Sequence, residues 1–308
     1  MVRRIVHKTY RLKRFIKDDI WTLEMEKLSK AKARFVKYVK AAIIAIRTFS
    51  SQKIGFQAVA LSFFSTMSVV PFVAVVFAVT GGLGLSDRLT GLLHGYFTDS
   101  QEIIDMVLGF AQNIILTAQS STMGLVSALL FLWIVIWMML SVERVFNNVW
   151  KVQVSRNIFK RITVVLAMLL LSPFVVIIFF AGSVVYSHIL RYMGLDMEKL
   201  TIFKTLLTWI IFAVLAVFTL SMMYKFIPNA DVKYSNAFRA AVPAAVSFSI
   251  MQYMYLETQV FVSRLNAIYG AFAAVPLFMI WLNIGWFIIL IGAELSYAFQ
   301  HVDSYNVE

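Results

Sequence analysis

The sequence contains no cysteine, and only 14% of its 308 residues are charged. The lack of cysteine excludes disulfide bonds and thiolate chemistry, although it does not identify the compartment. Soluble domains are typically ~45–50% apolar and ~25% charged, whereas this chain is 60% hydrophobic with a mean hydropathy of +0.79. The shortage of charge therefore excludes a soluble domain and predicts an all-α protein that crosses a membrane several times.

Motifs for enzymatic chemistry are also missing. The sequence has no glycine-rich phosphate loop ending in GK[ST], no HExxH and no GxSxG, the patterns that position phosphates, zinc or a nucleophilic serine. Its four histidines are scattered and lack neighbours at metal-ligand spacing. We therefore expect no catalytic residue, no cofactor, no metal site and no enzymatic activity. No acidic pair lies in the middle of an apolar run, which disfavours an ion-coupled transporter of small solutes.

Six apolar segments are long enough to cross a ~30 Å hydrocarbon core as helices. They cover about residues 54–79, 123–142, 162–189, 202–223, 237–256 and 270–292. Between the first two, apolar residues recur on one helical face over 103–115, after an Asp99 and Glu102 pair that resembles a capping box. This pattern predicts an amphipathic helix outside the membrane, and no internal repeat relates the two halves of the chain.

The distribution of lysine and arginine predicts the orientation. Residues 1–53, the loop after the second span and the loop after the fourth span hold 23 of the 28 Lys and Arg residues. Because cytoplasmic segments of membrane proteins are enriched in these residues, both termini are expected in the cytoplasm. The excess over 16 Asp and Glu residues is thereby explained without nucleic-acid binding.

The chain divides into a basic cytoplasmic arm (1–53), a six-span membrane domain (54–299) and a cytoplasmic tail (300–308). From Phe35 onward the arm alternates apolar and basic residues at helical spacing. This pattern predicts an amphipathic helix along the inner membrane surface, attracted by anionic headgroups. The alternative is that the arm only directs topology.

Charged residues at the inner ends of spans form the first group of candidate site residues. Glu143 ends the second span and Glu294 ends the sixth. A carboxylate at that depth needs a cationic or hydrogen-bonding partner, and we predict pairing with Arg144, Arg161 and Arg239. Such pairs would either lock the helix ends, or act as an inner gate or a site for an anionic headgroup.

Uncharged polar residues inside the spans form the second group, and residues before the sixth span form the third. Small hydroxyl residues are ordinary at helix interfaces, so packing is favoured over the lining of a transport pathway. The pathway candidates are Ser62, Ser65, Thr66, Gln252 and Asn283, and the candidates for an outer mouth are Arg264, Asn266 and Tyr269.

The most distinctive motifs are NAIYGAFAAVPLF at 266–278, GAE at 292–294 and FIPN at 226–229. With them, the chain from about 53 to 299 resembles the YihY/BrkB family of bacterial inner-membrane proteins, once mislabelled as ribonuclease BN. The resemblance implies a six-span helical protein of the inner membrane with a poorly defined activity. Some relatives are proposed to move lipid or lipopolysaccharide precursors, and others are linked to serum resistance.

Two functional hypotheses follow from these residues. The first is a transporter or flippase-like carrier of an amphiphilic anionic lipid or envelope precursor. The alternative is a non-transporting membrane scaffold that assembles envelope proteins. A ribonuclease is disfavoured because no metal-binding cluster is visible in the sequence. The expected partners are membrane lipids, with a second copy of the chain or other envelope proteins as further candidates, and no nucleic acid.

Overall fold

The computed structural model describes residues 20–21, 29–96, 101–120, 122–152, 157, 159–160, 163, 201–264 and 274–304. Within these residues the regular elements are all α-helices, which confirms the all-α prediction. In chain order they are α2 (Lys30–Ser51), α3 (Ile54–Gly82), α4 (Ser86–Tyr96), α5 (Gln101–Ser120), α6 (Thr122–Val149), α8 (Thr201–Phe226), α9 (Tyr234–Arg264) and α11 (Ala274–His301).

Four of the described helices are long and apolar enough to cross a membrane. These segments are Ile54–Gly82, Gly124–Val149, Trp209–Phe226 and Pro276–His301, and they coincide with the predicted first, second, fourth and sixth spans. The chain is therefore a multi-pass helical membrane protein by the length and composition of its helices.

The other two predicted spans are not among these four. Helix α9 covers the predicted fifth span, but polar residues such as Arg239 and Gln252 lower its hydropathy. The predicted third span, 162–189, lies outside the described residues except for Thr163. The count of six spans stays a prediction.

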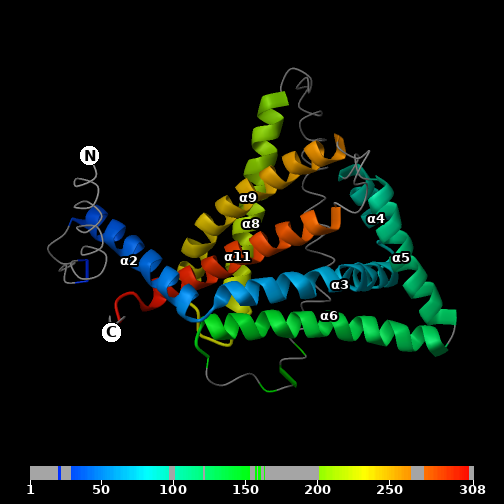
Figure 1. Cartoon of the computed structure of the whole chain (residues 1–308), viewed down its shortest axis with the longest axis horizontal. Coiled ribbons are helices and arrows are strands. Elements are labelled where there is room, and N and C mark those ends of the chain that lie inside the picture. The colour runs from blue at the N-terminus through cyan, green and yellow to red at the C-terminus, as the bar shows by residue number, and fades with distance from the viewer. Residues whose placement is uncertain are drawn as a thin grey trace.

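The helices meet at one end of the molecule and separate toward the other (Figure 1). We call the meeting end the inner end, because it contains the start of α3 and the ends of α6, α8 and α11, all predicted to face the cytoplasm. Its core contains Ile54, Phe146, Tyr224 and Leu290. The α9 side of this core is built from alanines, which allow helix backbones to approach closely. They are Ala237, Ala240, Ala241, Ala244 and Ala245.

A second, smaller core lies where α4 and α5 pack against the far end of α3 (Figure 1). It contains Val76 and Phe77 of α3, Leu89 of α4 and Leu108 of α5. Leu108 belongs to the apolar face predicted for an amphipathic helix at 103–115. In the structure this face packs on the bundle, as expected for an apolar stripe that must be removed from water.

Helix α2 packs on α11 instead of standing apart as an arm. Ala41 and Ile44 belong to the inner core, and Lys37 Nζ lies 2.6 Å from Asp303 Oδ2 beyond the end of α11. The Tyr38 ring makes an edge contact with Phe299, with 4.9 Å between the ring centres. Residues 41–44 of the predicted arm therefore pack with the membrane helices, while the division at 53 and 299 stays a prediction.

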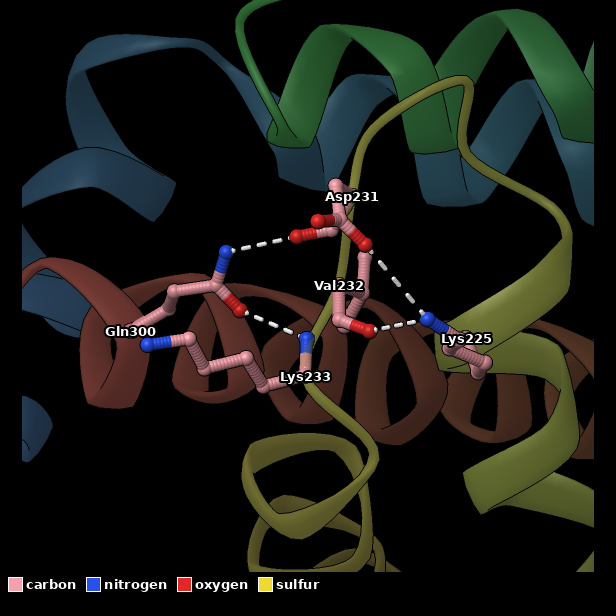
Figure 2. Close-up of polar contacts among 5 residues, drawn as sticks. All are labelled: Lys225, Asp231, Val232, Lys233 and Gln300. Atoms are coloured by element: carbon pink, nitrogen blue, oxygen red, sulfur yellow. Dashed lines mark hydrogen bonds and ion pairs between the residues drawn. The ribbon is translucent and has the colours of Figure 1, made fainter.

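Side-chain hydrogen bonds hold the α8–α9 turn against α11 (Figure 2). Gln300 Nε2 donates to the Asp231 carbonyl at 2.8 Å, and Gln300 Oε1 accepts from the Lys233 backbone N–H at 2.9 Å. Lys225 Nζ donates to the Val232 carbonyl and lies 3.7 Å from Asp231 Oδ1.

The end of α6 holds the same turn at a second point. Asn147 Oδ1 accepts from the Asn229 backbone N–H at 2.7 Å. The FIPN turn is thus tied to α6 as well as to α11, so that the end of α8 and the start of α9 have fixed positions at the inner end.

Candidate functional site

Glu294 is a fully buried carboxylic acid, with a relative exposure of 0%. It lies two turns before the end of α11, in a stretch where Leu290, Ala293 and Ala298 belong to the inner core. Within the described part of the chain, neither carboxylate oxygen accepts a hydrogen bond. An ionised carboxylate in such surroundings is costly unless it is paired and hydrogen-bonded, so this side chain needs a chemical explanation.

Lys151 is the basic residue whose charge acts on Glu294. It lies two residues after the end of α6 and has a left-handed backbone with φ 51°. Its Nζ lies 5.2 Å from the ring centre of Tyr297, which is one helical turn after Glu294. Lys151 is exposed, so it connects the buried acid to the solvent-facing side of the inner end.

Trp150 and His301 complete the surroundings of Tyr297. The Trp150 ring lies edge-on to Tyr297 at 5.6 Å, and the His301 ring stacks on Tyr297 at 4.2 Å. Among the described residues, the buried indole N–H of Trp150 and the buried hydroxyl of Ser296 have no hydrogen-bond partner.

The predicted pairing of Glu294 with Arg144 and Arg239 is not formed. Both arginines are exposed, and Arg161 lies outside the described residues. Glu143 is buried with a relative exposure of 5%. Because neighbouring residues on a helix point about 100° apart, an inward Glu143 places Arg144 on the outer side of α6.

Lys151 and Trp150 were missed as site residues because the second span was expected to end at residue 142. Helix α6 continues to Val149, so the helix end that meets α11 lies two turns beyond the apolar run. The sequence signal for Lys151 is a lysine directly after an inner helix end. Its left-handed backbone is not predicted by the sequence pattern.

The hydroxyl residues of α3 are used mainly in helix packing. Ser62 Oγ donates to the Val59 carbonyl and Thr66 Oγ1 donates to the Ser62 carbonyl, both at 2.8 Å. Ser65 Oγ accepts from Trp286 Nε1 of α11 at 2.9 Å in a buried contact. These bonds join α3 to α11 and return hydroxyls to their own helix, as expected for packing positions.

Gln252 and Asn283 have different surroundings. Gln252 Oε1 accepts from Trp281 Nε1 at 2.9 Å, which joins α9 to α11. Asn283 is half-buried, and its side chain makes no hydrogen bond with the described residues. It precedes Glu294 by eleven residues, so the two point within about 20° of each other on α11. One face of α11 therefore carries two polar side chains that have no hydrogen-bond partner in the described part of the chain.

The candidates for an outer mouth cannot be placed together. Arg264 is the last residue of α9, and Asn266 and Tyr269 lie outside the described residues. The outer mouth stays a prediction.

The apolar helices of spanning length define a multi-pass membrane protein. The buried acid at its inner end makes charge and hydrogen bonding the chemistry that this site could use. The family model described as "Virulence factor BrkB" matches residues 45–307. The chain belongs to this family, which confirms the resemblance found in the sequence.

Several curated bacterial proteins are similar to this chain over most of its length. A UPF0761 membrane protein of Chlorobium limicola is 28% identical over 299 residues, which cover 95% of this chain and 66% of the relative. One from Chromohalobacter salexigens is 26% identical, covering 77% of this chain and 57% of the relative. A Haemophilus influenzae protein is 25% identical, covering 81% and 91%. This chain thus spans less than two thirds of the length of the first two, and no solved structure matches it.

Proposed function

We propose that this protein moves an amphiphilic anionic lipid or envelope precursor across the bacterial inner membrane, as a transporter or flippase-like carrier that does not itself hydrolyse nucleotides. The observation that carries the proposal is the face of α11 on which Asn283 and Glu294 lie at two depths of a membrane span. Polar groups without partners are costly inside a membrane. Such groups can instead bind the polar part of a substrate that passes along the helix.

The basic residues of the inner end support an anionic substrate. Arg144 and Arg239 are exposed instead of paired with Glu294, and Lys151 is exposed as well. Guanidinium groups bind phosphate and carboxylate headgroups through paired hydrogen bonds. We assign these residues, with Arg161, to attracting the headgroup, and Glu143 and Glu294 to gating the inner end.

The proposal includes a topology of six spans with both termini in the cytoplasm. Helix α9 is the fifth span and residues 162–189 are the third. The bias of 23 of 28 Lys and Arg residues toward one side supports this orientation. Helix α2 contains six basic and no acidic residues, and it exposes Phe35 at 70% and Ile46 at 69%. These features suit contact with the anionic inner leaflet.

The function can be tested with the full chain reconstituted in liposomes that contain fluorescent lipid analogues with anionic or zwitterionic headgroups. Movement between leaflets is followed by quenching of the outer-leaflet label. We expect faster movement of the anionic analogues with protein than without it, and a slower rate for Asn283→Ala. The matched control is Ser247→Ala, because Ser247 is exposed and bonds only to its own helix at Pro243. Failure to accelerate any analogue would refute the proposal.

A second candidate function is the membrane scaffold, favoured by the docking of α2. Because α2 is held to α11 and to Asp303, its exposed basic and apolar residues form a surface of fixed position. A scaffold predicts envelope proteins that co-purify with the full chain and are lost when the exposed α2 residues Phe35 and Ile46 are both replaced with serine. It also predicts that Asn283→Ala is tolerated, whereas a carrier predicts the reverse.

A further inference from the structure

Glu294 combines complete burial with the absence of a hydrogen bond to either oxygen among the described residues. Ionising such a group places a negative charge where neither water nor a hydrogen-bond donor solvates it. The missing solvation costs several kcal/mol per ion in proteins. A neutral carboxylic acid avoids most of this cost, since its remaining demand is for hydrogen bonds. The packed inner end therefore favours the protonated form of Glu294.

Every element packed at the inner end contributes charged or titratable groups. They include Lys37, Lys40 and Arg47 of α2, Lys53 before α3, Glu143 and Arg144 of α6, Lys151 after α6, Tyr224 and Lys225 of α8, Arg239 of α9, and Tyr297 and His301 of α11. Lys53 and Arg239 are exposed, Lys40 Nζ lies 5.6 Å from the Trp21 ring centre, and Tyr224 donates to the Ile289 carbonyl. Among them, Lys151 carries the positive charge that acts on Glu294.

The surroundings of Glu294 favour a proton over a metal ion as its ligand. The described residues contain no group of three or more His, Cys, Asp or Glu side chains that could hold a metal ion. A metal ion at Glu294 would therefore lack further ligands among them. A proton on the carboxyl group removes the buried charge and needs no further ligand.

We propose that Glu294 binds and releases a proton that is coupled to transport. In the packed state described above, the proton is on a Glu294 oxygen. When the inner end opens, the O–H bond breaks, the proton passes to cytoplasmic water, and the carboxylate left behind is stabilised by Lys151. This inference rests on the proposed transport function and adds an energy source to it.

The coupling follows from the position of Glu294 in the bundle. Helices α2, α3, α6 and α9 all pack on α11, and the inner core surrounds the residue. An ionised Glu294 is tolerated only where water reaches it, so the protonation state shifts the balance between packed and open inner ends. Asn283 lies three turns away on the same face. A movement of α11 would therefore displace Asn283, and a headgroup bound to it, together with Glu294.

The first test measures proton binding without transport. Infrared difference spectra of the full chain in lipid nanodiscs, recorded between acidic and alkaline buffers, detect the carbonyl stretch of protonated carboxylic acids. We expect one such band at neutral pH in the wild type, its loss in Glu294→Gln, and its retention in Glu294→Asp. The control is Glu257→Gln, since Glu257 is exposed on α9. Identical spectra for the wild type and Glu294→Gln would overturn the inference.

The second test measures coupling in the liposome assay. A gradient of about one pH unit can shift the distribution of substrate up to ~tenfold for each coupled proton. We expect a gradient-dependent shift in the wild type and in Glu257→Gln, and none in Glu294→Gln. A Glu294→Gln variant that responds like the wild type would refute coupling at this residue.

The two tests separate this inference from the proposed function. A Glu294-specific band with no lipid movement in any lipid would refute transport and support the proton site. Lipid movement without the band would refute the proton site and support transport. Glu294→Gln preserves side-chain size and mimics the neutral acid, so it should insert and unfold like the wild type in acidic buffer. Loss of folding in acidic buffer would also contradict a protonated Glu294.

Discussion

Replacing Gly292 with alanine should weaken the contact among α8, α9 and α11. A Cβ atom at this position would overlap the hydroxyl of Tyr224 and lie 2.8 Å from Ala244 Cβ. Tyr224 is fully buried and donates to the Ile289 carbonyl at 3.1 Å, so its ring cannot swing into solvent. The absence of a side chain at Gly292 is therefore what allows the phenol to lie against α11.

The expected loss combines three terms. Overpacking a core typically costs about 1–3 kcal/mol, and displacing the Tyr224 hydroxyl would remove a hydrogen bond worth about 0.5–1.5 kcal/mol. The better helix propensity of alanine offsets about 0.8–1 kcal/mol. We expect Gly292→Ala to lower the free energy of unfolding by about 1–3 kcal/mol, because the steric term exceeds the gain in propensity.

Thermal unfolding of the purified full chain in detergent measures this loss. The matched control is Gly109→Ala in α5, where an added Cβ meets no atom within 4 Å and should be neutral or stabilising. Adding Tyr224→Phe to Gly292→Ala removes the closest overlapping atom and should recover part of the loss. The reasoning is refuted if Gly292→Ala unfolds at the wild-type temperature, or if the double variant recovers nothing.

Three further predictions concern contacts between helices. A double-mutant cycle with Ser65→Ala and Trp286→Phe should give a coupling energy of about 0.6–1.7 kcal/mol, the range of hydrogen bonds between membrane helices, and a coupling near zero would show that the two side chains are independent. Asn147→Ala should lower the free energy of unfolding by about 1–3 kcal/mol, because it leaves the Asn229 N–H without its acceptor. We expect faster proteolysis of the α8–α9 turn in the native protein. An unchanged cleavage rate would contradict the contact. Gln300→Ala removes two hydrogen bonds to the same turn. Because the Gln300 contacts are more exposed, the loss of unfolding free energy should be smaller, about 1 kcal/mol by thermal unfolding. A loss larger than that of Asn147→Ala would contradict this ranking.

Hydropathy and charge in the sequence determined the class of protein and most of its helices. The segments at 54–79, 123–142 and 202–223 fall inside α3, α6 and α8, and the described part of 270–292 falls inside α11, because a run of apolar residues long enough to cross a bilayer is a local property. The motifs at 226–229, 266–278 and 292–294 were enough to recognise the family. Glu294 also stood out from the sequence alone, as an acid at the end of an apolar run.

The partners of Glu294 were decided by the tertiary structure. Pairing with arginines was inferred from their similar depth, but the phase of α6 places Arg144 outside the bundle. Helix α6 extends to Val149, and Lys151, just beyond it, is the cation whose charge acts on Glu294. Depth in a membrane follows from position along the chain. Direction around a helix axis, and the point at which a helix ends beyond its apolar run, depend on what the neighbouring helices bury.

The same distinction separates Gln252 from Asn283. In the sequence both are single amides within apolar helices, with nothing to rank one above the other. Only the packing of α9 on α11 brings Trp281 within 2.9 Å of Gln252, while the side chain of Asn283 receives no such partner among the described residues. Sequence alone determined at which positions polar side chains lie within the spans. Tertiary structure decided which of them have a hydrogen-bond partner, because a hydrogen bond between helices requires two side chains to face each other across one contact.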